Sequence, residues 1–140
     1  MVQRHPGYQR GEPNGTRVTR SGVWASCHWL IGRITIGGVR ASRFAKYFWS
    51  VIAVDSTRFR VLPNPKQRYL LNDATNPKYG PDGSLTLYFA AERPEEAPDG
   101  NWLPTPRGHK YRLTFRYYGP LDGVANGTYW PPAMIKLLPR

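Results

Sequence analysis

Residues 82–89 read DGSLTLYF, a turn signal followed by a regular alternation of apolar and polar side chains. Successive side chains of an extended strand point to opposite faces, so Leu85, Leu87 and Phe89 share one face. An Asp-Gly pair is typical of a tight turn, because both residues tolerate the backbone angles that turns need. We therefore predict a strand from Ser84 to Phe89 with its apolar face in a core.

Similar patterns extend outward from this strand in both directions. Residues 110–118 alternate aromatic or aliphatic side chains with Arg, Thr and Tyr, which predicts a second one-sided strand. Residues 47–55 are too dense in β-branched and aromatic side chains for a surface strand, which indicates a central one. Shorter runs predict strands or strand-like bends at residues 33–36, 59–62, 68–71 and 133–138. Residues 121–128 can hold a helical turn, which their glycines keep brief.

The spacing of these runs indicates the fold class. Gly and Pro contribute 14 residues each to a chain of 140, and no long amphipathic helix interrupts the short runs. Residues 101–106 are predicted to be stiff and extended, with prolines that prevent ladder hydrogen bonds. Six or seven short strands separated by turns favour an all-β antiparallel sandwich over a fold with alternating strands and helices.

The N-terminal third differs from the rest in composition and charge. Residues 1–21 are polar and rich in Gly, Pro and Arg, which predicts a flexible basic arm. Residues 22–46 form an apolar and basic segment with room for one or two strands, and residues 47–140 form the predicted sandwich. Residues 1–46 carry eight basic side chains against Glu12 alone, in a chain of net charge +11. This asymmetry indicates anionic partners.

Several classes of protein and site are disfavoured by simple counts. A single cysteine, Cys27, excludes an internal disulfide and a multi-cysteine zinc site. The most apolar stretch, residues 23–36, is interrupted by polar residues and too short to cross a membrane. The first 20 residues lack the pattern of a signal peptide. His5, His28 and His109 do not have the spacing of metal ligands, so we predict no metal and no cofactor.

Cys27 and His28 form the one Cys/His neighbour pair, but adjacent side chains of a strand face opposite ways. Catalysis by this pair is therefore disfavoured. The acidic stretch from Glu92 to Gly100 lacks the pattern of a calcium loop and is interpreted as a solvated loop. The sequence also contains no phosphate-binding glycine loop, serine nucleophile elbow or zinc-protease motif.

Ordered motifs across residues 47–138 resemble the family catalogued as domain of unknown function 1214. The matching motifs are Phe48-Trp49-Ser50, Pro63-Asn64-Pro65 with Arg68-Tyr69, residues 82–87, Asn101-Trp102-Leu103-Pro104, Leu113-Thr114 with Arg116 and Tyr118, and residues 127–132. The resemblance implies a jelly-roll-like β-sandwich that commonly follows a domain of unknown function 1254 in larger proteins. It also implies a bacterial protein, exported or associated with the cell envelope. The family has no agreed catalytic residues.

Residues 1–46 do not resemble the strands that family members carry before the Phe-Trp-Ser motif. Either residues 22–39 supply substitute strands, or a partner domain or a second copy completes the sheet. Missing strands leave open sheet edges, which pair readily with other chains. We therefore expect self-association as one possible role.

Five side chains are candidates for ligand binding: Arg68, Asn101, Trp102, Arg116 and Trp130. A Trp beside an amide can stack on a sugar ring or base and bond to its edge, and an arginine in the open end of the sandwich can hold an anion. In the alternative interpretation, Trp102 closes the end of the sandwich and Asn101 satisfies loop backbone groups. Trp130 has the same two interpretations, and the arginines either face outward or bond to loop carbonyls.

The sequence thus favours a non-catalytic β-sandwich module with a structural, assembly or ligand-binding role. The alternative is a hydrolase-like enzyme with its site in the sandwich mouth near Arg68, Asn101, Trp102 and Arg116. A third hypothesis is that the basic arm, with its aromatic residues Tyr8, Trp24 and Trp29, binds nucleic acid or another anionic polymer through phosphate contacts and stacking.

Overall fold

The computed structural model describes residues 9–10, 17–25, 31–37 and 45–137, with side chains described from residue 31 onward. The strands are β1 (Gln9–Arg10), β2 (Arg17–Ala25), β3 (Ile31–Ile36), β4 (Ala45–Asp55), β5 (Leu70–Asn72), β6 (Leu85–Ala90), β7 (Trp102–Pro104), β8 (Lys110–Pro120) and β9 (Ile135–Leu137). Among the described residues, short helical segments accompany them: η2 (Asp73–Thr75), η3 (Asp99–Asn101) and α1 (Asp122–Asn126). The predicted all-β class is confirmed, and α1 lies where a helical turn was expected.

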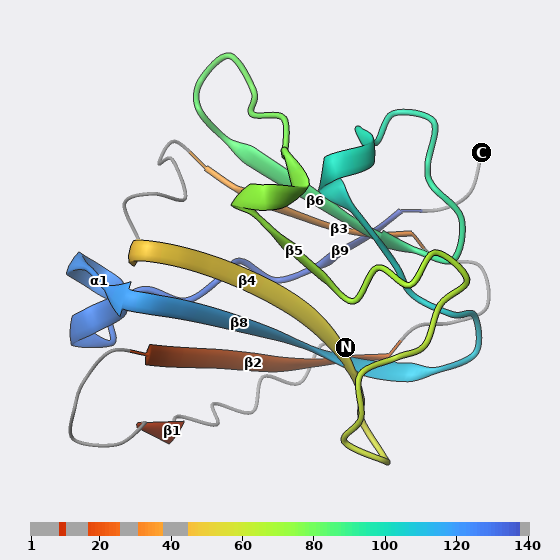
Figure 1. The fold of residues 1–140 in the computed structure, drawn as a ribbon, viewed down its shortest axis with the longest axis horizontal. Coiled ribbons are helices and arrows are strands. Elements are labelled where there is room, and N and C mark those ends of the chain that lie inside the picture. The colour runs from red at the N-terminus through yellow and green to blue at the C-terminus, as the bar shows by residue number, and fades with distance from the viewer. Residues whose placement is uncertain (1–8, 11–16, 26–30, 38–44, 138–140) are drawn as a thin grey trace.

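The strands form two sheets that pack as a sandwich (Figure 1). Sheet A has the order β1-β2-β8-β4-β5, and sheet B has the order β7-β6-β3-β9. The predicted central strand, β4, lies inside sheet A between β8 and β5. No helix in the described part of the chain is long and apolar enough to cross a membrane.

One strand pair departs from the predicted antiparallel arrangement. β7 runs parallel to β6, with Tyr88 opposite Trp102 and Phe89 opposite Leu103. The expectation that prolines keep residues 101–106 out of a ladder was therefore wrong for this segment. Pro104 stands last in β7, so it ends the strand without interrupting the ladder.

The segments upstream of β4 supply strands to both sheets. β2 pairs with β8 along its whole length, from Arg17 opposite Tyr118 to Ala25 opposite Lys110. β3 lies between β6 and β9. β2 begins at Arg17, so this strand takes in the last residues of the segment that we assigned to a flexible arm. Both β2 and β3 come from this chain, one in each sheet.

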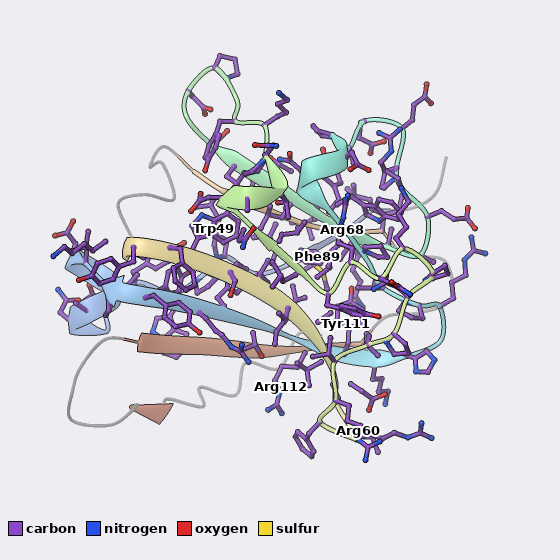
Figure 2. All side chains as sticks on the ribbon, viewed as in Figure 1. Trp49, Arg60, Arg68, Phe89, Tyr111 and Arg112 are labelled. Carbon is purple, nitrogen blue, oxygen red and sulfur yellow. The ribbon has the colours of Figure 1, made fainter. Side chains whose placement is uncertain are left out.

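The core fills the space between the two sheets. On sheet A, Trp49 and Val51 of β4 and Phe115 of β8 are 2%, 0% and 1% exposed. Leu87 and Phe89 of β6 oppose them from sheet B, and both are fully buried. Figure 2 shows Trp49 and Phe89 among the side chains around the two sheets. Burying one such side chain contributes about 2 kcal/mol to stability, so the alternation in β6 and β8 determines which face becomes the core.

A second, smaller cluster covers the outer face of sheet B. Tyr88 and Trp102 pack there with Ala97, and Ile31 lies against them. The loop that carries Ala97 folds over the sheet, and the Arg93 guanidinium donates to the Ala97 carbonyl oxygen at 2.7 Å. The interpretation of this loop as fully solvated was wrong at Ala97, which is 1% exposed. Trp102 accordingly lies on a sheet face and not at the end of the sandwich.

Residues 59–62 do not form the predicted strand. A single bridge joins Val61 to Val54, and the chain before it makes a tight reversal. Phe59 has a positive φ of 54°, which an extended strand cannot contain. The run therefore closes a hairpin at the end of β4.

Candidate functional site

Three of the five candidate side chains meet where η3 leads into β7. Arg68 comes from the turn before β5, Asn101 ends η3, and Trp102 begins β7. The Asp99 side chain, which the sequence had not singled out as a partner, joins them. We call this group, made of Arg68, Asp99, Asn101 and Trp102, the Arg68 corner.

The turn before β5 fixes the backbone of Arg68. The side chain of Asn64 accepts a hydrogen bond from the Arg68 N–H at 3.1 Å and donates one to the Arg68 carbonyl oxygen at 2.7 Å. The Pro63-Asn64-Pro65 motif brings the chain into this turn, and Asn is a residue whose short side chain bonds to nearby backbone. As a result, Arg68 leaves the turn in one defined direction.

The Arg68 guanidinium has three acceptors in the chain itself. It donates to the Asp99 carboxylate at 2.6 Å, to the Trp102 carbonyl oxygen at 3.1 Å and to the Asp99 carbonyl oxygen. The Arg68 side chain is 23% exposed, so it lies mostly within this corner. The arginine therefore connects the turn before β5 to both ends of η3. This agrees with the alternative interpretation, in which the arginine bonds to loop carbonyls.

The charge of Arg68 is balanced within the corner. Its hydrogen bond to Asp99, with the nearby Lys66 ammonium at 3.7 Å, holds the pKa of that carboxyl below its usual value of 3.8. Asp99 remains 57% exposed, so solvent screens the ion pair and its contribution to stability is small. An anion that approached Arg68 would have to displace a carboxylate already in place.

Asn101 uses every polar atom of its side chain on the backbone. Its Oδ1 accepts from the Lys78 N–H at 2.7 Å, and its Nδ2 donates to the Lys78 and Thr86 carbonyl oxygens, both at 2.8 Å. The residue is 1% exposed. An amide offers two donors and an acceptor, and all three bond within the chain. Asn101 therefore attaches the loop before β6 to the start of β7.

Trp102 is held in the same way. Its indole Nε1–H donates to the Ala90 carbonyl oxygen at 3.0 Å, and the residue is 4% exposed. Lys66 places its ammonium 5.1 Å from the centre of the ring. A stacking platform for a sugar needs an open ring face, and this ring lies under the loop that carries Ala97.

Gly100 completes the corner by close backbone packing. The Thr75 hydroxyl donates to the Gly100 carbonyl oxygen at 3.0 Å, which joins η2 to η3. A Cβ at Gly100 would collide with the backbone oxygens of Thr75 and Asn76. Glycine is needed here because two chain segments touch through their main chains.

The other two candidates lie elsewhere. Arg116 belongs to β8, between the core residues Phe115 and Tyr117, so its side chain projects from the opposite, outer face of sheet A. Trp130 follows α1 and is 39% exposed. Of the four residues predicted to share a sandwich-mouth site, Arg116 therefore does not join Arg68, Asn101 and Trp102.

Cys27 and His28, which we considered as a catalytic pair, and Tyr8 lie outside the described residues. The same holds for the side chains of the basic N-terminal segment. Among the described residues, no three His, Cys, Asp or Glu side chains gather in a way that can hold a metal ion.

Two partners in the corner, Asp99 and Lys66, were missed by sequence reasoning. Asp99 lies 31 positions after Arg68 in the sequence, and Lys66 stands in a Pro-rich turn. No local pattern connects the two segments, because the pairing follows from the approach of η3 to the turn before β5. The one available signal was the acidic composition of the loop before Asn101.

Comparison with known proteins gives a family and a fold. Residues 33–122 match the family described as "Protein of unknown function (DUF1214)". The match begins inside β3, upstream of the Phe-Trp-Ser motif where the resemblance had started. No curated protein matches the chain.

Two crystal structures share the fold. The VPA0106 protein from Vibrio parahaemolyticus has a TM-score of 0.73 and 23% identity, over 90% of this chain and 32% of that one. An uncharacterized protein from Burkholderia cenocepacia has a TM-score of 0.66 and 22% identity, over 91% of this chain and 31% of that one. The chain thus spans about a third of the length of each. At this level of identity the likeness concerns the fold alone.

Proposed function

We propose that this chain, which belongs to the DUF1214 family of proteins of unknown function, is a non-catalytic structural module that acts by assembly. A module of this kind supplies a rigid body and a contact face, and it needs no reactive group. The fold by itself does not define a role, so the argument rests on the described side chains.

The observation that carries the proposal is that the polar groups of the candidate site are already used. Asn101 bonds to Lys78 and Thr86 through all three of its hydrogen-bonding sites. Arg68 donates to the Trp102 carbonyl oxygen and to the Asp99 carboxylate, and the Trp102 indole donates to the Ala90 carbonyl oxygen. A catalytic or binding group must keep some of its capacity for the substrate, whereas these three hold loops together.

A contact face for assembly is available on the outer side of sheet A. Phe48 of β4 and Tyr118 of β8 stack there with ring centres 4.1 Å apart, and Phe48 is 45% exposed. Two further large side chains at this end of β4 and β8 are exposed, Tyr47 at 64% and Leu121, which follows β8, at 37%. Aromatic side chains are enriched at protein interfaces, because they bury much surface at a small cost in side-chain entropy. We call this group the Phe48 face.

Length supports the same proposal. In the two similar crystal structures the matching region is about a third of the chain, so there the sandwich is one part of a larger protein. Domains of one chain commonly contact one another through interfaces, so a sandwich within a longer chain is expected to need a contact face. The Phe48 face has the composition for such a contact.

Sedimentation velocity over a micromolar concentration range tests the assembly role. An uncovered aromatic face is expected to pair with a second copy, so we expect a dimer in the parent chain. The double variant Phe48→Ser/Tyr118→Ser should be monomeric, and Tyr69→Ser, which removes an exposed aromatic elsewhere, should still dimerise. A parent chain that stays monomeric throughout contradicts the proposal.

Thermal denaturation with added sugars and small carboxylates tests the ligand-binding alternative. We expect no stabilisation, because a ligand raises the melting temperature only when it binds the folded state. Stabilisation that disappears in Arg68→Met would return the Arg68 corner to the ligand-binding hypothesis. If no added compound stabilises the protein, the hydrolase alternative also loses support, because its proposed site then binds none of these ligands.

A further inference from the structure

The hairpin at the end of β4, residues 55–60, is built as a rigid projection. The Asp55 N–H donates to the Arg60 carbonyl oxygen at 2.8 Å, and the Phe59 N–H donates to the Asp55 carbonyl oxygen at 3.0 Å. The Asp55 carboxylate accepts from the N–H groups of Thr57 and Arg58 at 2.8 and 2.7 Å. These bonds lower the pKa of Asp55. We call this segment the hairpin tip.

Phe59 at the hairpin tip is both strained and exposed. Its φ of 54° lies in the left-handed region, which is unfavourable for a large side chain. Its ring is 69% exposed, the highest value among the large hydrophobic residues described. An exposed aromatic ring gains no stability from burial in a core, and the strained backbone costs stability. Folding alone therefore does not account for an aromatic residue at this position.

Cationic groups surround the exposed ring. Arg58 and Arg60 flank Phe59 and are exposed. The Arg112 guanidinium, from the neighbouring β8, lies 5.7 Å from the ring centre, and Figure 2 shows Arg60 and Arg112 at the same end of the molecule. Lys110 adds another exposed positive charge.

The nearby negative charge does not neutralise this group. Asp55 is the single acidic residue in segments 55–60 and 109–112. Its carboxylate is held by the turn's own N–H groups, with the His109 ring nitrogen at 3.7 Å. The hairpin tip therefore presents three arginines and one aromatic ring to a partner.

We propose that the hairpin tip binds the surface of an anionic lipid bilayer. Phe59 enters the boundary between headgroups and acyl chains, and Arg58, Arg60 and Arg112 lie against lipid phosphates. Aromatic residues favour this boundary and basic residues are attracted to anionic lipid. Such binding goes beyond the assembly role, because it uses a different end of the molecule from the Phe48 face.

The shape of the hairpin tip favours a bilayer over nucleic acid. The hairpin projects beyond the end of the sheet (Figure 1), so it reaches an extended surface before the body of the protein does. Proteins that bind single strands combine a basic groove with several stacking aromatics. This tip is convex and has one ring, and Arg112 already lies over that ring.

Vesicle flotation tests the proposal with the full chain. We expect binding to vesicles of phosphatidylcholine mixed with phosphatidylglycerol, weakened by added salt, and little binding to phosphatidylcholine alone. Arg58→Ser/Arg60→Ser should weaken binding about 30-fold, because each arginine near an anionic surface contributes about a five-fold factor. Lys78→Ser/Lys136→Ser removes the same charge from exposed sites elsewhere and should bind nearly as the parent does.

Phe59→Gly separates binding from folding. Glycine accepts the positive φ, so the melting temperature should hold or rise while binding falls about ten-fold. Gln67→Gly is the matched control, since Gln67 is exposed with a φ of 51° but carries no ring. It should leave binding unchanged.

Three outcomes overturn the proposal. The first is equal binding to vesicles with and without phosphatidylglycerol. The second is full binding by Phe59→Gly or by the double arginine variant. The third is binding of a single-stranded oligonucleotide that Phe59→Gly abolishes while vesicles remain unbound, which would assign the tip to nucleic acid.

Discussion

The Arg68 corner and the hairpin tip are made from similar parts and use them in opposite ways. Each includes a short turn with a non-glycine residue at positive φ, Gln67 directly before Arg68 in one and Phe59 in the other. Each places a cation near an aromatic ring, Lys66 near Trp102 and Arg112 near Phe59. In the corner, the arginine and the indole bond to the chain's own oxygens, whereas at the tip the ring and three arginines are displayed. Local composition therefore does not separate a structural corner from a contact surface.

The largest expected effect is that of Asn101→Ala in the corner. The change leaves the Lys78 N–H and the Lys78 and Thr86 carbonyl oxygens without their partner. We expect a loss of about 4 kcal/mol in the free energy of unfolding, measured by urea titration. Asn126→Ala, which removes an amide that bonds within an exposed turn, should cost far less. Equal losses would show that Asn101 is not a special attachment point.

Gly100→Ala tests the close packing of η2 against η3. The added methyl group meets backbone oxygens of Thr75 and Asn76, which cannot move as a side chain can. We expect a loss of about 2 kcal/mol. Gly37→Ala is the control, because a Cβ there has no neighbour within 4 Å. If Gly100→Ala left the free energy of unfolding unchanged, the backbone segments at this corner would be able to move apart more easily than their contacts indicate.

Arg68→Met tests the ion pair through its pH dependence. The folded-state pKa of Asp99 lies below its ordinary 3.8, so the pair's contribution is present above pH 3.8 and is lost as the pH falls through the folded value. We expect about 1 kcal/mol lower stability at neutral pH and a smaller loss on acidification than in the parent. Urea titrations at several pH values measure both, and an unchanged acid slope would contradict the assignment.

The smallest expected change, with the opposite sign, is at the tip. Phe59→Gly removes the strain at φ 54° and should raise the free energy of unfolding by up to ~1 kcal/mol. A clear destabilisation would mean that the exposed ring contributes to folding through Arg112, and the contrast between corner and tip would weaken.

Sequence pattern predicted the parts of the fold that depend on local periodicity. The alternation in residues 84–89 and 110–118 predicted β6 and β8 with the correct inward faces, and the dense run in residues 47–55 predicted the interior strand β4. In β6 and β8 the face that packs in the core can be read from the spacing of the apolar residues alone.

Features that depend on a distant partner were not predictable. The parallel pairing of β7 with β6 and the bond from Arg68 to Asp99 join segments whose approach no local motif encodes. Residues 59–62 were mistaken for a strand because Phe59, Val61 and Leu62 match a strand in composition. The hydrogen bonds of the Asp55 carboxylate instead stabilise a turn in which the chain reverses direction.

The position of β8 has a consequence for how the protein folds. β8 is the partner of both β2 and β4, and β3 needs β6 and β9. A nascent chain that has not yet exposed residues 110–120 therefore cannot assemble most of sheet A. Folding dominated by such long-range pairing is slow, in the range of milliseconds to seconds. We expect the sandwich to form late in synthesis, with β2 and β4 unpaired until β8 has been synthesised.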